Sequence, residues 1–434
     1  MINWYKVVLF SGLILICYVI FIYDRPPKPA EGKVQVRLMI DISPDFFQKF
    51  NELIDEFEEA NPDIEVVHQR RAGDYFTKVQ TLMVAKICPD VLTFTGKRVN
   101  AFKLKGTLLN LMPYIRRDKF DLDDFFEVGL RDAQMTENEI CYLPIEGSGT
   151  VLFYNKDAFD EIGLAYPNDD WTWEDFLKAG IALTADLNGD GRNDRVGIFV
   201  DYWWGAMMPW IWSNGGKMVN ESQTECLLNR PEAVGAMQFV TDLETKYKVT
   251  AKALGGTESA GWNENFAGGR VGMMCDLAYG LKALMPVIRA GNLRWSIAMQ
   301  PKGRVRRPIR YTSSGFVIWK GTKHPEEAWK LIKFLEGRKF MKEYCDTHYF
   351  IPARKSLAMS KEFLDRPDTP YDERVLVRAL EEARPLDNVY ALRSIEYDFS
   401  TELGKILAGV RSAQEAMDIV TQRANIELKK AADQ

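Results

Sequence analysis

The 434-residue sequence predicts an α/β protein of two or more lobes, and three observations support this fold class. The chain is longer than one hydrophobic core usually supports. Its composition, 46% hydrophobic and 27% charged residues, is that of an ordinary globular protein. Beyond residue 33, segments of strand composition alternate with segments of helical periodicity, which indicates a parallel sheet with helices packed on its faces.

The first element is an apolar segment that precedes the folded body. Val7–Tyr23 is a run of 17 residues without charge, and no small-residue cleavage site follows it. Ile16 stands before Cys17, where a lipoprotein signal needs a small residue. We therefore expect an uncleaved membrane anchor, followed by a stiff proline-rich linker that ends at Gly32.

The folded body opens with a strand predicted over 34–42 and a helix that starts at Ser43 and Pro44. Further strands are predicted over 64–67, 89–94, 151–155, 196–200 and 271–275, and further helices over 74–85, 175–184, 231–247 and 325–335, with two more within 400–430 on either side of Gly409. In open sheets of this kind the ligand lies at the carboxyl ends of the strands. Asp41 and Phe94 occupy such ends and are candidate ligand contacts.

Residues 201–216, DYWWGAMMPWIWSNGG, hold four of the eleven tryptophans. The closing NGG resembles a helix C-cap, so a helix is expected over about 206–213. On that helix Trp210 and Trp212 lie about 200° apart, and one apolar stripe cannot bury both. We therefore expect the core, completed by neighbouring helices, to enclose at least one of these two rings.

Trp203 and Trp204 precede that helix, on the loop after the strand predicted over 196–200. This loop is where a ligand site is expected in an open α/β sheet. A sugar offers C–H faces to an aromatic ring and hydroxyl groups to nearby carboxylates. We hypothesise that one of these two rings stacks on the ligand.

The charge pattern excludes some classes of partner. A net charge of −5 and a pI near 5.6 argue against a nucleic-acid-binding protein, which would carry a basic patch. The longest basic cluster is short and is interpreted as part of a solvated loop: Arg304, Arg306, Arg307 and Arg310. Six scattered cysteines and three isolated histidines make a zinc site or a histidine-based catalytic site improbable. The cysteines are expected to be small apolar core residues, with one or two disulfides left open.

The segment DLNGDGRND carries the sharpest local motif of the chain. Asp186, Asn188 and Asp190 match the opening of an EF-hand calcium loop, and Asp194 is a further oxygen donor. The position of the bidentate glutamate is occupied by glycine. Two interpretations stay open: a structural calcium ion, or a polar turn between a helix and a strand. No cofactor is required in either case.

The order of several motifs resembles a known family. The matching segments are PDV at 89–91, LPIEGSGTVLFYNKDAF at 143–159, WTWEDF at 171–176, SNGG at 213–216, NFAGGRVGMM at 265–274, KGTKHPEEAW at 320–329 and IPAR at 351–354. Their order and spacing are similar to those of the extracellular solute-binding proteins of ABC importers, of the maltose-binding type. The resemblance implies a non-enzymatic protein whose two α/β lobes close over a ligand and present it to a membrane permease.

The resemblance also implies domain boundaries. Residues 1–32 form the anchor and linker, 33–146 and 302–348 form lobe 1, and 147–301 with 349–434 form lobe 2. The fold implied is the type II periplasmic-binding-protein fold, in which hinge strands join the lobes. Gly147 and Gly149 suit a hinge, because glycine accepts backbone changes without a steric penalty.

The resemblance adds candidate ligand contacts to those given by strand ends. Tyr279 matches a place where the family puts a stacking aromatic ring, and Asp276 beside the strand can accept hydrogen bonds from hydroxyl groups. Glu146 and Ser148 face the expected cleft by position, as do Asp41 and Phe94. For each residue a purely structural role in a loop or cap stays open.

The sequence and the resemblance together therefore predict an extracytoplasmic binding protein that is monomeric and anchored to the membrane by 7–23. It is expected to bind a carbohydrate and deliver it to an ABC permease. Nucleic acid is not an expected partner. Two alternatives remain. One is a tethered sensor that passes ligand occupancy to a membrane partner. The other is a glycoside hydrolase with paired carboxylates at Glu146 and Asp276, although no catalytic signature accompanies them.

Overall fold

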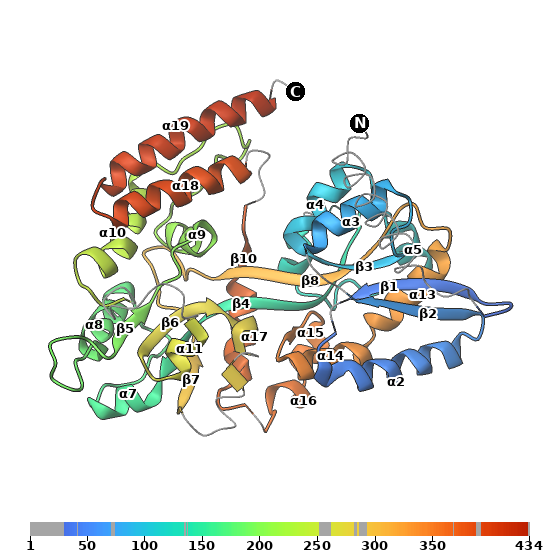
Figure 1. Ribbon diagram of the computed structural model, residues 1–434, viewed down its shortest axis with the longest axis horizontal. Helices are drawn as coiled ribbons and strands as arrows, with labels where there is room; N and C mark the ends of the chain where they lie inside the picture. Colours follow the sequence, from blue (N-terminus) through green and yellow to red (C-terminus); the bar gives the residue numbers. More distant parts are fainter. Residues whose placement is uncertain are drawn as a thin grey trace, which may run out of the picture. The chain divides into compact units, whose positions relative to one another are not determined.

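The computed structural model describes residues 30–40, 42–70, 74–133, 136, 138–250, 262–281, 284–285, 293–367, 369–387 and 392–432. The predicted anchor and Asp41 lie outside these residues. Within the described ranges, no helix is both long enough and apolar enough to cross a membrane. The chain divides into two compact units, one ending at Thr93 and completed by Ile318–Phe334, the other made of Phe94–Val317 and the chain from Leu335 onward (Figure 1).

The first unit is a parallel α/β layer. Its elements are β1 (Val34–Ile40), α2 (Pro44–Ala60), β2 (Ile64–Arg70), α3 (Tyr75–Val84), the start of β3 (Val91–Thr95) and α13 (Pro325–Leu335). β1 pairs in parallel with both β2 and β3. Helix α2 begins after Ser43 with Pro44 in its first turn, and it buries an apolar face headed by Phe46 and Phe50. These observations confirm the parallel sheet predicted for this part of the chain.

The second unit contains the remaining elements. Its first half holds α4 (Gly96–Leu104), α5 (Met112–Asp118), α6 (Glu127–Asp132), β4 (Leu143–Asn155), α7 (Lys156–Glu161), α8 (Trp173–Leu183), β5 (Val196–Phe199), α9 (Trp204–Ser213) and α10 (Pro231–Thr245). Its second half holds α11 (Trp262–Ala267), β6 (Val271–Leu277), a 3-10 turn at Ala278–Gly280, β7 (Trp295–Ala298), β8 (Arg310–Ile318), α14 (Arg338–His348), β9 (Ile351–Pro352), α15 (Lys355–Ala358), α16 (Lys361–Leu364), α17 (Glu373–Glu382), β10 (Arg384–Pro385), α18 (Leu392–Leu407) and α19 (Ala413–Ala432).

Strand β4 organises the second unit. All 13 of its residues are buried, and it pairs antiparallel with β8 and β9 near its start and with β6 and β7 toward its end. Strand β5 pairs in parallel with β6. The sheet of this unit is therefore mixed, whereas the alternation of strands and helices had predicted parallel pairing. The difference arises because β4 runs opposite to every strand with which it pairs.

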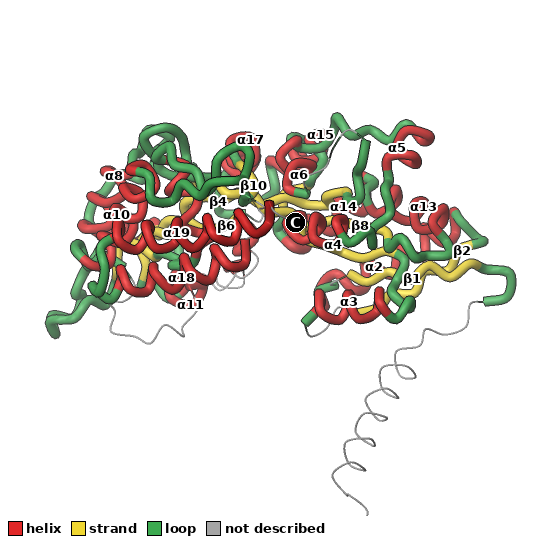
Figure 2. Tube along the Cα trace, turned by 90° about the horizontal axis from the view of Figure 1, so that it is seen from above, coloured by secondary structure: helices red, strands yellow, loops and turns green. Residues whose placement is uncertain are grey.

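The helices of the second unit follow the sequence with small shifts. α9 begins at Trp204, two residues before the predicted start, and ends at Ser213. Asn214 is its C-cap, and Gly215 after it takes the left-handed conformation expected there. α18 begins at Leu392, eight residues earlier than predicted, and Gly409 separates it from α19. Figures 1 and 2 show α18 and α19 side by side.

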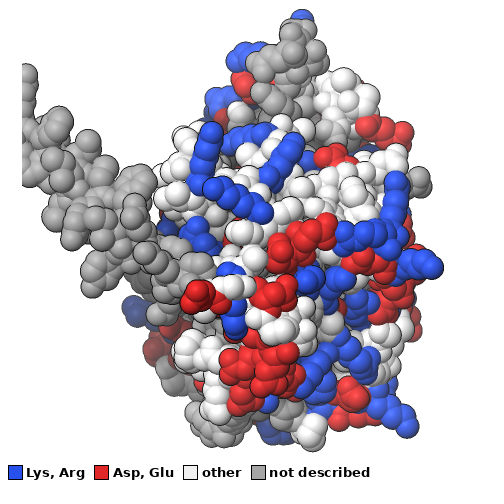
Figure 3. Space-filling model, turned by 90° about the vertical axis from the view of Figure 1, so that its right-hand side faces the viewer, with Lys and Arg blue, Asp and Glu red and all other residues white. Residues whose placement is uncertain are grey.

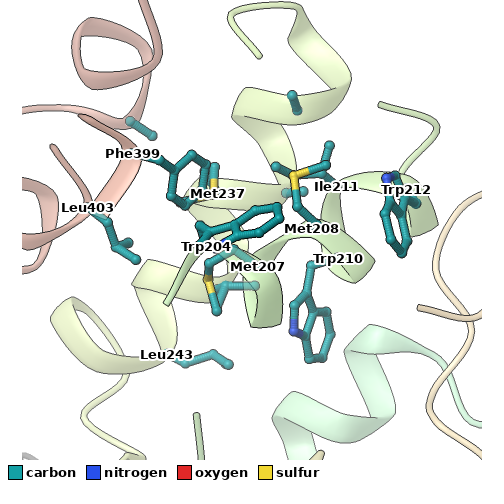
Figure 4. Close-up of a cluster of buried hydrophobic side chains, with 14 of the residues drawn as sticks. Trp204, Met207, Met208, Trp210, Ile211, Trp212, Met237, Leu243, Phe399 and Leu403 are labelled. Atoms are coloured by element: carbon teal, nitrogen blue, oxygen red, sulfur yellow. The ribbon is translucent and has the colours of Figure 1, made fainter. Parts of the chain in front are cut away.

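The largest apolar cluster of this unit surrounds α9. Trp204, Trp210 and Trp212 are 6%, 5% and 2% exposed. At least one of Trp210 and Trp212 was expected in the core, and the structure buries both, together with Trp204. Figure 4 shows the side chains of α9 interleaved with Met237 and Leu243 of α10 and with Phe399 and Leu403 of α18. Neighbouring helices enclose α9 on several sides, so rings that point in different directions can all be buried.

The described cysteines are free thiols: Cys88, Cys141, Cys226, Cys275 and Cys345. Four are buried and Cys275 is half-buried, which confirms the expected role as small apolar core residues. Burial raises the pKa of the Cys88 thiol to about 12 and the pKa of Cys345 well above its usual range.

Candidate ligand-binding site

The candidate site lies in the second unit where β5 and β6 end. These two strands are parallel, so their carboxyl ends reach the same edge of the sheet. Asp201 follows β5, and Asp276 is the last residue but one of β6. Two carboxylates from separate parts of the sequence are thereby brought to one edge, where open α/β sheets bind ligands.

Trp203 stands at the same edge, at the N-cap of α9. Its side chain lies close enough to the carboxylate of Asp201 to lower the pKa of that group, and its backbone N–H donates to the Asp201 carbonyl over 3.0 Å. Its ring lies 5.9 Å from that of Trp204 in an edge-to-face arrangement. A Cβ atom at Gly205 would collide with the Trp203 ring, so the absence of a side chain there allows the ring its position. The ring remains half-buried.

Arg310, the first residue of β8, completes this group. Its guanidinium carbon lies 4.9 Å from the centroid of the Trp203 ring, within cation–π range. Its backbone N–H donates to Thr150 Oγ1 over 2.9 Å, which joins the start of β8 to β4. Arg310 and Arg307 are each only 8% exposed, so the interpretation of this basic cluster as a solvated loop was wrong for both. Arg307 instead donates to the carbonyls of Gln300 and Asp169, each over 2.7 Å.

Burial raises the pKa values of the carboxyl groups of the site, and the charge of Arg310 lowers them. Burial raises the pKa of Asp276 to about 6, while the Leu277 N–H and the charge of Arg310 lower it. Burial also raises the pKa of Asp201, against the effects of the Arg310 charge and of the Trp203 side chain. The charge of Asp201 adds to the increase at Asp276, and the shared cation limits both increases.

Asp132 on α6 is a third carboxyl within the electrostatic reach of Arg310. It accepts a hydrogen bond from Ser313 Oγ over 2.8 Å, and Ser313 accepts one from the Tyr142 hydroxyl over 2.9 Å. Burial raises the pKa of Asp132 to about 7, against the Ser313 hydrogen bonds and the charges of Lys97 and Arg310. Sequence reasoning missed Asp132 and assigned Arg310 to a solvated loop, because no strand had been predicted at residue 310.

Glu146 is placed differently from the expected cleft residue. It lies within β4 opposite Ser314 of β8, is 4% exposed, and has one carboxyl oxygen, Oε2, that accepts no hydrogen bond from the described residues. Burial raises its pKa to about 8, so the group is mostly protonated at neutral pH. The residue opposite Asp276 on β4 is Val151, five positions beyond Glu146. At about 3.3 Å per residue this separates the two sites by roughly 16 Å along the strand.

The other predicted contacts divide between core positions and undescribed side chains. Ser148 is 2% exposed within β4, and Phe94 is 1% exposed with its ring 4.7 Å from that of Phe102. Trp204 belongs to the apolar cluster around α9. Tyr279 lies on the 3-10 turn directly after β6, but its side chain is outside the described set, as is Asp41.

The predicted calcium loop is closed by hydrogen bonds of its own. Asp186 accepts from the backbone N–H groups of Gly189 and Gly191 over 2.7 and 2.8 Å. Asp194 accepts from the backbone N–H of Leu187 over 2.8 Å and from the side chain of Asn188 over 3.0 Å. Among the described residues, no three His, Cys, Asp or Glu side chains are grouped so that they could hold a metal ion. These bonds are compatible with both interpretations left open, a structural calcium ion and a polar turn, and each stays a prediction.

Known proteins match the chain over most of its length. The family of bacterial extracellular solute-binding proteins matches residues 42–342. A binding protein of Brucella abortus (strain 2308) is 25% identical over 332 residues, which cover 74% of this chain and 76% of the relative. The ABC substrate-binding protein Lmo0181 of Listeria monocytogenes, solved with cycloalternan, matches with a TM-score of 0.78 and 25% identity over 92% of this chain and 99% of that one.

A second solved structure has the same fold at lower identity. The sugar-binding protein MalE of Xanthomonas citri matches with a TM-score of 0.76 and 20% identity over 92% of this chain and 98% of that one. The likeness confirms the predicted two-lobed α/β fold class. The proteins of this family bind solutes and are not enzymes, in agreement with the prediction from the motifs. By the extent of the family match and the fold it shares with these binding proteins, the chain belongs to the bacterial extracellular solute-binding proteins.

Proposed function

We propose that the protein captures a carbohydrate outside the cytoplasm and delivers it to an ABC permease. The observation that supports this most directly is the grouping of Trp203 with Asp201, Asp276 and Arg310, where β5 and β6 end and β8 begins. An aromatic ring packs against the C–H faces of a sugar, and carboxylate and guanidinium groups exchange hydrogen bonds with its hydroxyls. The matched Listeria and Xanthomonas proteins are a cycloalternan-bound substrate-binding protein and a sugar-binding protein.

The glycoside hydrolase alternative has no support in the carboxyl geometry. Paired carboxyls of such enzymes are about 5–10 Å apart. Asp276 pairs with Val151 on β4, and Glu146 lies five residues before Val151, which is farther than that range. Because five is an odd number, the side chains of Glu146 and Asp276 also point to opposite faces of the sheet. The family itself consists of binding proteins.

The finer parts of the prediction remain proposals: hinge closure, lobes at 33–146 with 302–348 and 147–301 with 349–434, a monomer, and an anchor at 7–23. The tight packing at Gly147 and Gly149 supports glycine at the proposed hinge. A Cβ at Gly147 would lie against the Tyr311 hydroxyl, and one at Gly149 would lie 3.2 Å from Ala379 Cβ. The anchor also keeps open a tethered sensor as the alternative to a transport component.

The test begins with a thermal-shift screen of linear and cyclic oligosaccharides, because a solute that binds only the folded state raises the melting temperature. Calorimetry on the best ligand then compares wild type with Trp203→Ala. The matched control is Trp319→Ala: Trp319 is also half-buried and also packs against a glycine, Gly321, but lies in the first unit. Loss of affinity in the first variant alone supports the proposal. A panel in which no sugar stabilises the protein would reject it.

A further inference from the structure

Arg310 is a buried cation whose role is not explained by chain packing alone. Only 8% of Arg310 is exposed. Burying a charged side chain costs free energy unless other groups compensate the charge. The partners of Arg310 come from four separate elements, and three of them carry carboxyl groups. Such convergence on one guanidinium is typical of a residue that organises a site.

The groups that face Arg310 can be named element by element. Asp201 comes from the loop after β5, Asp276 from β6 and Asp132 from α6, and the charge of Arg310 lowers the pKa of each of them. Lys97 on α4 is close enough for its own pKa to be lowered by Arg310, and Glu396 on α18 acts on Lys97 in the opposite direction. The Trp203 side chain, which stands beside Asp201, also lowers the pKa of that carboxyl.

We propose that Arg310 is the positioning residue of the candidate ligand site: it holds the Trp203 ring by stacking on it and keeps Asp201 and Asp276 available as hydrogen-bond acceptors for the ligand. The inference rests on the proposed function for its ligand, but its geometric part does not. The ring, the two carboxylates and the guanidinium form one unit: the guanidinium stacks on the ring, the ring stands beside Asp201, and the guanidinium charge acts on both carboxylates. The backbone N–H of Trp203 also donates to the Asp201 carbonyl.

Two properties of arginine are required in this arrangement. Its positive charge favours the ionised carboxylates, which are otherwise protonated more readily because they are partly buried. Its planar guanidinium stacks on an aromatic face, which the compact ammonium group of lysine does less well. Arg310→Lys therefore removes the planar guanidinium and keeps the charge, whereas Arg310→Gln removes the charge as well.

The ligand-free arm of the experiment follows the indole N–H resonance of Trp203, identified by its absence in Trp203→Phe. The Trp203 indole lies close to the Asp201 carboxyl, so the chemical shift of its N–H proton responds to the ionisation of that carboxyl as the pH changes. We expect the titration midpoint to move to higher pH in Arg310→Gln and to stay near the wild-type value in Arg310→Lys. The lysine variant should instead change the chemical shift itself, because the ring loses its planar partner.

The matched control is Arg307→Gln. Arg307 is as buried as Arg310 and lies three residues away, but it bonds to Gln300, Asp169 and Glu382 instead of the site. It should leave the Trp203 midpoint unchanged even if it lowers stability. An unchanged midpoint in Arg310→Gln, or a lysine variant that matches wild type in every respect, would overturn the proposal. If Arg310→Gln does not fold, the lysine variant still decides the stacking role.

The ligand arm uses calorimetry with maltotriose and with cycloalternan as probes. We expect Arg310→Gln to lose at least about tenfold in affinity and Arg310→Lys to lose less. Equal affinity in wild type and Arg310→Gln would refute the role in ligand binding. If wild type binds neither probe, the carbohydrate proposal fails for these sugars, whereas the ligand-free arm still accepts or rejects the positioning role of Arg310.

Discussion

Helix α9 has two ends with different surroundings, although both are rich in tryptophan. At its start, the Trp203 ring is half-buried, stacks on a charged guanidinium and lies beside the carboxylate of Asp201. Along the rest of the helix, Trp210 is packed among Trp173, Phe176 and Phe239, with ring centroids 5.4–6.0 Å apart. The comparison teaches that the neighbours, and not the residue type, divide these rings between ligand site and core.

The largest expected effect lies on the core side of this comparison. Trp210→Ala should lower the free energy of unfolding by about 3–5 kcal/mol, because it removes a large buried ring and leaves a cavity. Chemical denaturation of the purified variant measures the loss. Ligand affinity of the fraction that stays folded should be close to wild type. A variant that unfolds at the wild-type denaturant concentration would show that the ring is not an essential part of the core.

The second prediction concerns the buried carboxyl group of Glu146 and its effect on stability. Glu146 has a folded-state pKa of about 8, above its ordinary value of 4.5, so the folded state holds the proton more tightly than the unfolded chain. Its contribution to stability is therefore present below about pH 4.5 and is lost as the pH rises through 8. Glu146→Gln mimics the protonated group, and at pH 9 it should be more stable than wild type by about 2–4 kcal/mol.

The control for this prediction is Glu402→Gln, which should act in the opposite direction. Glu402 is also fully buried, but ion pairs with Lys405 and Arg411 hold its pKa below the usual range despite the burial. Removing its charge leaves two cations without their partner and should destabilise the protein at pH 9. Unfolding curves at pH 5 and pH 9 compare both variants. A Glu146→Gln variant that is less stable than wild type at pH 9 would contradict the raised pKa.

On the ligand side, Trp203→Ala should cost about 2 kcal/mol of binding free energy, roughly a thirtyfold loss of affinity, with little change in stability. Calorimetry and thermal melting of the same preparation separate the two quantities. The comparison with Trp210→Ala is the decisive one. If both variants lose stability equally and neither loses affinity, the whole tryptophan cluster belongs to the core.

The smallest effect concerns the loop at 186–194. A calcium ion there would add to hydrogen bonds that already close the loop, so a chelator should lower the melting temperature by only about 1–3 °C. Asp190→Ala should remove this sensitivity. A melting curve that does not respond to the chelator assigns the loop to a polar turn without an ion.

The helices and strands that could be predicted are those that local signals determine. Ser43 with Pro44 starts α2, and Gly215 ends α9, each through backbone preferences that a sequence shows directly. The candidate site could be predicted only in part. The loop after a predicted strand indicated Trp203, and the family resemblance indicated Asp276. The antiparallel pairing of β4 with β8, however, is a long-range property. It buries Glu146 and brings Arg310 to the site, and no local pattern reveals that.

The free cysteines have a practical consequence. Thiols react as thiolates, and burial keeps those of Cys88 and Cys345 protonated far above neutral pH. With Cys17 and the half-buried Cys275 replaced by serine, a single new cysteine on an exposed position near α9 could be labelled with a fluorescent dye while the buried thiols stay unmodified. The protein then offers a ready background for an optical sugar sensor, in which a change of dye emission replaces calorimetry as the record of binding.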